Sequence, residues 1–178
     1  MPSASRSATL KSTKGGLMNT ILFATDGSPS AKAAAQEALE LAKATGWKLR
    51  VITVWRAPIL NGYGFAPAPY MPELADIERD HANKVAREAV ETAKAAGIDA
   101  TGELRQGDAS DAICAAAEET AARLIVMGAH GWGAVQRLVF GSVSTSVLHH
   151  AHCPVLVVRG VDHETEHETA KVAETASR

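Results

Sequence analysis

Short apolar segments alternate with longer alanine-rich segments over residues 19–160, and this alternation restricts the fold more than any other feature of the chain. The apolar segments cover residues 20–24, 49–55, 124–127 and 154–158. The first of them is a continuous apolar run, as expected for a strand that is buried on both faces of a sheet. A weaker, more polar strand is predicted at 101–106, where its composition suits a sheet edge. Strands that alternate with helices predict an α/β fold with a parallel sheet and right-handed crossovers.

Capping signals place the helices between these strands. Ser28 followed by Pro29 predicts the start of a helix over 30–44, which ends at Gly46. Asp108 is the expected N-cap of a helix that reaches Ala122, and a further helix is expected over about 142–151.

The remaining helix is predicted over 73–96, where apolar residues recur every three or four positions. Its expected buried face consists of Leu74, Ile77, His81, Val85, Ala89 and Ala93. The preceding Pro- and Gly-rich segment, 56–72, interrupts both periodicities and is expected to be a surface loop.

Composition narrows the class of protein. A chain of 178 residues fits one domain. The formal net charge of -2 gives no reason to expect binding to nucleic acid or to an anionic membrane. No apolar run approaches the roughly 18 residues of a membrane-spanning helix. Cys114 and Cys153 match no disulfide framework and no zinc-site spacing, so we expect small buried thiols and a cytoplasmic protein.

Both ends of the chain are expected to lie outside the folded domain. Residues 1–17 are predicted to form a disordered extension, 18–160 the domain, and 161–178 an acidic disordered tail. The tail contains His163-Glu164-Thr165-Glu166-His167, which matches the H-E-x-x-H pattern of zinc proteases. No apolar stripe is available to dock a helix there, so we interpret the match as accidental. The three histidines at 149, 150 and 152 are likewise attributed to the favourable dipole at a helix end rather than to a metal site.

The candidate ligand site lies where an open parallel sheet binds ligands, beyond the carboxyl ends of its strands. One candidate segment is 24–28, after the first strand, and the other is 127–144. Gly141 and Ser142 open a helix whose free N–H groups and dipole favour an anion, and the hydroxyls of Ser142 and Ser144 add donors. The alternative is that the glycines only make tight turns and Ser142 only caps its helix. Neither a Walker A loop nor G-x-G-x-x-G is present.

The glycine spacing resembles the ATP-binding signature of the universal stress protein family, G-x2-G-x9-G-[ST]. Gly128, Gly131, Gly141 and Ser142 match it at every position, and the resemblance extends over 18–160. It implies an adenine-nucleotide α-hydrolase-like (Rossmann-like) α/β fold with a five-stranded parallel sheet of order 3-2-1-4-5 and helices on both faces. It also implies a homodimer formed through the last strand, Pro154 to Val158.

The resemblance further implies roles for particular residues. The implied nucleotide site consists of Ala24, Thr25, Asp26 and Val54 beside adenine and ribose, of Met127, Gly128, His130 and Gly131 around the ribose and first phosphates, and of Gly141, Ser142, Val143 and Ser144 at the distal phosphates. Asp26 is the residue expected to help orient Mg²⁺ or Mn²⁺ with the nucleotide, although an Asp after a strand can also serve only as a helix cap.

Three residues of the second segment leave alternatives open. His130 stands where many relatives carry Arg, and a neutral imidazole interacts more weakly with phosphate than a guanidinium does. Arg137 either compensates for this or is simply exposed to solvent. Trp132 either covers the nucleotide or a partner, or is an exposed loop residue.

The function that we expect is ATP binding by a stress-response or signalling module, with slow ATP hydrolysis left open. An adenylating or ATP-hydrolysing enzyme is one alternative, but it would need a longer phosphate loop than Asp26-Gly27-Ser28-Pro29 provides. A dimeric interaction scaffold without nucleotide is another alternative. A binder of AMP or of a cyclic nucleotide is the third, because its adenosine pocket would look alike.

Overall fold

A computed structural model describes residues 19–57, 72–132 and 140–160 of the chain. Five parallel strands form one sheet in the order β3-β2-β1-β4-β5. In chain order the elements are β1 (Thr20–Ala24), α1 (Pro29–Thr45), β2 (Lys48–Trp55), α2 (Pro72–Ala95), β3 (Ala100–Gln106), α3 (Ala109–Glu119), β4 (Leu124–Gly128), α4 (Ser142–His150) and β5 (Val155–Val158). The α/β fold expected from the sequence pattern and the strand order implied by the family resemblance are confirmed.

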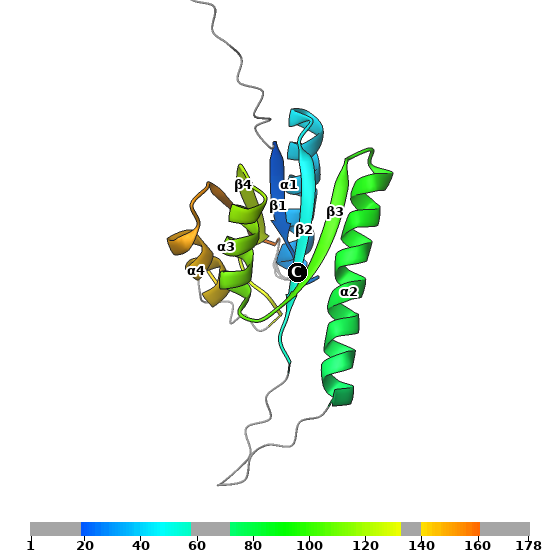
Figure 1. The fold of residues 1–178 in the computed structure, drawn as a ribbon. Helices are drawn as coiled ribbons and strands as arrows, with labels where there is room; N and C mark the ends of the chain where they lie inside the picture. The colour runs from blue at the N-terminus through cyan, green and yellow to red at the C-terminus, as the bar shows by residue number, and fades with distance from the viewer. Residues whose placement is uncertain (1–18, 58–71, 133–139, 161–178) are drawn as a thin grey trace, which may run out of the picture.

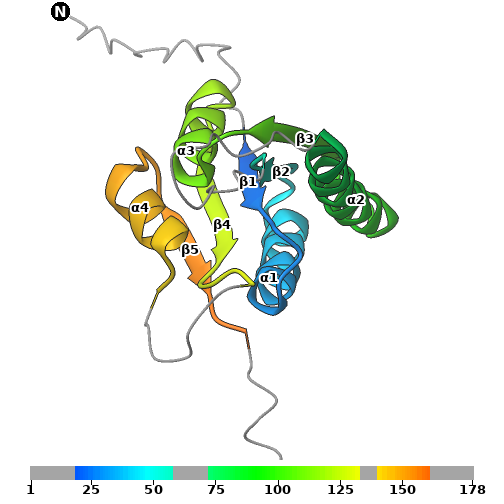
Figure 2. The same ribbon diagram turned by 90° about the horizontal axis from the view of Figure 1, so that it is seen from below.

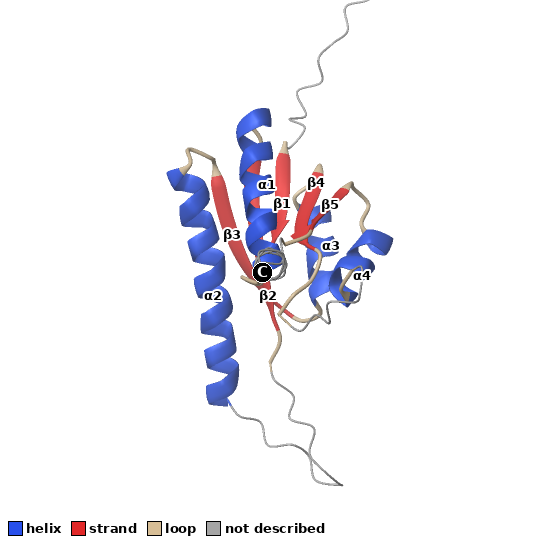
Figure 3. Cartoon of the chain, turned by 180° about the vertical axis from the view of Figure 1, so that it is seen from behind, coloured by secondary structure: helices blue, strands red, loops and turns tan. Residues whose placement is uncertain are grey.

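The helices form a layer on each face of the sheet (Figure 1; Figure 2). Helices α1 and α2 cover one face, which is seen from the front in Figure 3, and α3 and α4 cover the other. Successive residues of β1 point to opposite faces: Ile21 and Phe23 pack under α1 and α2, whereas Leu22 and Ala24 pack under α3 and α4. This alternation explains why β1 is apolar at every position.

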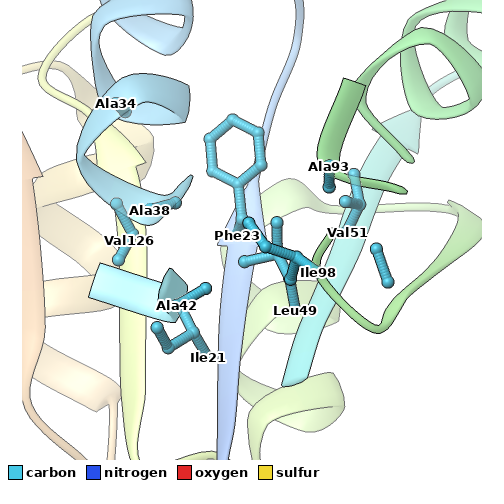
Figure 4. Close-up of a cluster of buried hydrophobic side chains, with 11 residues drawn as sticks. Ile21, Phe23, Ala34, Ala38, Ala42, Leu49, Val51, Ala93, Ile98 and Val126 are labelled. Carbon is cyan, nitrogen blue, oxygen red and sulfur yellow. The ribbon is translucent and has the colours of Figure 1, made fainter. Parts of the chain in front are cut away.

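Small side chains let the helices lie close to the sheet. On the first face, Ala34, Ala38 and Ala42 of α1 pack with Phe23 and Val126 (Figure 4). All five of these side chains are almost completely buried. The alanines of these segments therefore form the helix faces that contact the sheet, as the alanine-rich composition indicates.

The cap of α1 is formed as the sequence predicts. Ser28 is the N-cap, its hydroxyl accepts a hydrogen bond from the backbone N–H of Ala31, and Pro29 occupies the first turn. Gly46 ends the helix in the left-handed conformation, with φ of 69°.

The predicted end of α3 was wrong. The helix stops at Glu119 rather than at Ala122, because Ala121 adopts a left-handed φ of 46°. The N–H of Ala122 then donates to the carbonyl of Ala117, and that of Ala121 donates to Glu118, which is a Schellman ending. No glycine stands at this position, so the usual sequence signal for a helix end is missing.

The predicted buried face of α2 was also partly wrong. Ile77 has 62% of its surface exposed and His81 is exposed as well, while Ala75, Ala82 and Ala86 are buried. At 3.6 residues per turn, Ala75, Ala82 and Ala86 share one face of α2, whereas Ile77 lies about 200° around the helix from Ala75 and is on the opposite side. Across the described residues, no helix is both long and apolar enough to span a bilayer.

Candidate nucleotide site

A cavity of about 450 Å³ opens at the carboxyl ends of β1, β2 and β4, on the face covered by α3 and α4. All twelve residues that the sequence singled out line it: Ala24, Thr25, Asp26, Val54, Met127, Gly128, His130, Gly131, Gly141, Ser142, Val143 and Ser144. The two candidate segments are adjacent because β1 and β4 are neighbouring strands, with Ala24 beside Met127. The topology therefore assembles one site from segments that lie about a hundred residues apart in the sequence.

The loop after β1 forms one wall of the cavity and is stabilised by hydrogen bonds between its own residues. The Thr25 hydroxyl accepts from the backbone N–H of Gly27 (3.2 Å), and the Asp26 Oδ1 accepts from that of Ser28 (3.0 Å). The backbone N–H of Thr25 donates to the carbonyl of Ile52 on β2, at 3.0 Å. Asp26 therefore shapes the turn with one carboxylate oxygen, while its side chain stays exposed at the cavity.

Asp26 is also the residue expected to face a metal ion. Its other oxygen, Oδ2, lies so close to Gly131 that a Cβ on that glycine would stand 2.7 Å from it. In the described segments, no three His, Cys, Asp or Glu side chains come together as a metal site. An ion at Asp26 would therefore need further oxygen ligands from a bound molecule, such as phosphate groups.

The opposite wall depends on the N-terminal part of α1. A Cβ on Gly128 would stand 2.5 Å from the Ser30 hydroxyl oxygen and 2.8 Å from the backbone nitrogen of Ala31. The hydroxyls of Ser28 and Ser30 both donate to the carbonyl of His130, the first at 3.2 Å. Gly128 thus allows α1 to approach β4, and the two serines fix the backbone of the loop that follows.

The beginning of α4 closes the cavity. The N-cap of α4 is Gly141, with no side chain bonded to the first-turn N–H groups. The Gly141 N–H donates to the carbonyl of Ala129 at 2.8 Å. Because the first N–H groups of a helix have no intrahelical partner, those at the start of α4 remain donors for an anion in the cavity.

The two serines of this helix start have different positions. Ser142 is exposed at the cavity, where its hydroxyl is accessible to a ligand. Ser144 is only 2% exposed, and its hydroxyl donates to the carbonyls of Ala129 (2.9 Å) and Gly141 (3.0 Å). Ser144 therefore positions the loop through these bonds, and its role as a phosphate donor stays a prediction.

Other singled-out side chains are placed apart from the cavity or outside the described residues. Trp132 does not line it: the indole N–H donates to the carbonyl of Asp26 at 2.9 Å, and the ring faces the other side of the loop after β1. Arg137 and the H-E-x-x-H segment lie outside the described residues. The histidines at the end of α4 have separate contacts, His150 with the carbonyl of Ser146 and His152 with Glu118. Burial raises the pKa of the thiols of Cys114 and Cys153, which keeps them protonated.

The sequence analysis missed the wall that α3 contributes. Ala109 and Ile113 of α3 line the cavity, and Ile52 of β2 adds a further apolar side chain, with Ala31 and Ala129 completing the set. The α3 segment has no glycine pattern that would mark it as part of a site. Its place follows only from the fold, since α3 packs against β2 beside the loop after β1.

Asp108 fixes the start of α3 and gives a pH-dependent prediction. Its carboxylate accepts from the Ser110 hydroxyl (2.6 Å), from the backbone N–H groups of Ser110 and Asp111, and pairs with Arg56 (2.7 Å). The bond from the Ser110 hydroxyl is the first cause that holds the pKa of Asp108 below its ordinary value of 3.8. Because folding lowers this pKa, the stabilisation is complete above about pH 4 and is lost as the pH falls through the folded-state pKa.

We therefore expect Asp108→Ala to lower the free energy of unfolding more at about pH 7 than at about pH 3. Urea unfolding of both chains at several pH values measures the difference. Asp108→Asn is the matched control, because it keeps a capping oxygen but has no charge to titrate. A difference between wild type and Asp108→Ala that does not change with pH would contradict the assignment.

Fold and site together define a Rossmann-like α/β protein with a ligand cavity at the point where the strand order reverses. The comparison with protein families identifies it further: residues 18–159 match the universal stress protein family, and the chain belongs to that family. A curated relative from Thermus aquaticus, a universal stress protein encoded 3' of a sulfhydrylase, is 40% identical over 143 residues, which are 80% of this chain and all of the relative.

Solved structures agree with this assignment. Universal stress protein UspA from Lactobacillus plantarum superimposes with a TM-score of 0.69 at 29% identity, covering 80% of this chain and 98% of that one. A universal stress protein solved in complex with cAMP gives 0.59 at 28% identity, covering 80% and 97%. The protein from Archaeoglobus fulgidus in complex with dAMP gives 0.57 at 25% identity, covering 79% and 97%.

Proposed function

We propose that this chain binds an adenine nucleotide, and ATP in particular, in the cavity between the loop after β1 and the start of α4. The observation that carries the proposal is that one cavity combines apolar walls with the N-terminus of a helix. Ile52, Val54 and Ile113 offer apolar surface to a planar base, and the first N–H groups of α4 offer donors to phosphate. Relatives of the same family crystallised with cAMP and dAMP support the adenine class.

The full signature of glycines supports ATP rather than a smaller nucleotide. Gly131 leaves room beside Asp26, and Gly141 turns the chain so that α4 begins at the cavity. We propose that Mg²⁺ or Mn²⁺ enters together with the nucleotide, with Asp26 and the phosphates as its ligands.

The biological role we propose is that of a stress-response module whose nucleotide occupancy is read by other proteins. Asp26 is the cavity's one carboxylate among the described residues, and it is engaged with the Ser28 N–H. Its Oδ1 shapes the turn and its Oδ2 is available to the proposed metal ion, so binding rather than turnover is the proposed function. We also propose a homodimer through β5, which forms an outer edge of the sheet.

A dimeric scaffold that binds no nucleotide is the second candidate. It is favoured by the packing of Gly128, which explains that glycine without any ligand, because a Cβ there would collide with α1.

The test is to extract freshly purified protein under denaturing conditions and to identify its nucleotides by mass spectrometry. We expect ATP in the extract, and magnesium-dependent ATP binding when the emptied protein is titrated. If the extract contains AMP or a cyclic nucleotide instead, that nucleotide is the ligand and ATP is not, while the proposed site is retained. An extract without nucleotide, together with no measurable affinity for any of them, would favour the scaffold.

A further inference from the structure

A second cavity, of about 350 Å³, lies on the other face of the sheet between α1 and α2. Its volume falls within the range of about 300–1,000 Å³ typical of small-molecule sites. The floor and inner walls are apolar and consist of Phe23, Ala35, Leu39, Leu49, Val85 and Ala89. Neither the glycine signature nor the proposed nucleotide site includes any of these residues.

The cavity exists because the two helices pack against the sheet rather than against each other. Helix α1 packs mainly on β4 and α2 on β2 and β3, and the two helices lie side by side on this face of the sheet (Figure 3). Ala35 and Ala89 face the cavity, where a larger side chain would fill it. The half-buried side chains of Leu39, Val85 and Ala89 line the cavity together with Phe23 and Leu49, which are each 2% exposed.

The rim of the cavity carries positive charge on both of its walls. Lys32 stands on α1 and Lys84 on α2. Glu88 is the acidic residue of this lining, and it lies 3.8 Å from the Lys84 ammonium, while Lys32 forms no ion pair within the described segments. His81 is the remaining titratable group at the rim. The balance favours an anionic head group above an apolar floor.

The two cavities share a wall. Thr25 and Ala31 line both of them. Gly27, with φ of 76°, packs against Val85 of α2, whose methyl carbon would stand 3.1 Å from a Cβ placed on that glycine. Trp132 lines the second cavity and bonds to the carbonyl of Asp26. A molecule in the second cavity therefore contacts the loop that shapes the nucleotide site.

We propose that this second cavity binds a small amphipathic anion, an aliphatic carboxylate whose chain lies against Leu39, Val85 and Ala89 and whose head group lies between Lys32 and Lys84. The inference goes beyond nucleotide binding and does not depend on it. Since both cavities share the loop after β1, occupancy of one is expected to change affinity at the other, reciprocally.

The experiment titrates the full chain by calorimetry with three ligands of equal chain length: octanoate, octan-1-ol and octylammonium. We expect one octanoate per chain, bound at least about tenfold more tightly than octylammonium, with octanol between them. The double substitution Lys32→Met and Lys84→Met keeps the apolar stems and removes the charges. It is expected to weaken octanoate at least about threefold and to leave octanol unchanged.

Two further variants distinguish binding in this cavity from nonspecific hydrophobic binding elsewhere on the protein. Ala35→Phe fills the cavity and should abolish binding of all three ligands, with thermal unfolding as the check that the chain folds. Lys43→Met, in the last turn of α1 and away from the cavity, is the matched control and should bind like wild type. Equal affinity for octanoate and octylammonium, or octanoate binding that survives Ala35→Phe, would overturn the proposal. So would a wild-type chain that binds none of the three, whatever the nucleotide measurements show.

Discussion

Replacing Gly128 by alanine is expected to lower the free energy of unfolding by about 2–3 kcal/mol, because the new methyl group would overpack the contact between β4 and α1. The nearest atoms are the Ser30 hydroxyl oxygen at 2.5 Å and the backbone nitrogen of Ala31 at 2.8 Å. A backbone nitrogen cannot move aside without displacing the helix. For a chain of this size, the melting temperature should fall by about 5–10 °C. Thermal unfolding followed by circular dichroism measures the shift.

Two comparisons test the cause of that loss. Adding Ser30→Ala removes the hydroxyl but leaves the backbone of α1, so it should not restore stability. Gly102→Ala is the contrasting case, because its Cβ would meet a side-chain methyl of Val90 at 2.8 Å, which can shift. We expect that substitution to change stability by less than about 1 kcal/mol. If Gly128→Ala melts like wild type, the packing explanation of this glycine is wrong.

The strands could be predicted because their burial is nearly complete and local. Ile21, Leu22, Phe23 and Ala24 are all buried, two on each face, so the apolar run in the sequence corresponds directly to the strand. The buried face of α2 could not be predicted in the same way. Ile77 fits one set of three- and four-residue spacings along α2, but the tertiary packing buries the set that contains Ala75, Ala82 and Ala86 instead.

The same distinction between local pattern and tertiary packing applies to the candidate site. Its glycines and the loop after β1 are recognisable because spacing along the chain determines them, and the structure brings these residues to one cavity. Ile113 and Ala109 join the cavity only through the packing of α3, which no local pattern reports. The role of Ser144 also depends on tertiary structure, since its hydroxyl is buried against the carbonyl of Ala129. The second cavity is a property of how two helices pack on the sheet, and no short motif marks it.

Replacing Ser142 by proline should separate phosphate recognition from the stability of the fold. Ser142 is the first residue of α4, a position where proline is well tolerated, and Gly141 before it has φ of -74° and ψ of 167°, as a residue before proline requires. The substitution removes one backbone N–H and one hydroxyl at the cavity while the helix stays intact. A hydrogen bond to a charged group contributes about 1.5–3 kcal/mol, so ATP affinity should fall at least about tenfold.

Adenosine distinguishes this effect from a general disturbance of the cavity. Since the nucleoside has no phosphate, its affinity for Ser142→Pro should equal that for the wild type. Ser142→Ala is the matched control: it removes the hydroxyl but keeps the N–H, so most of the ATP affinity should remain if the backbone donor dominates. Calorimetric titration of the three chains with ATP and with adenosine gives all the comparisons needed. Unchanged ATP affinity in the proline variant would show that the start of α4 does not bind phosphate. Equal losses for ATP and adenosine would show that the substitution disturbs the base pocket instead.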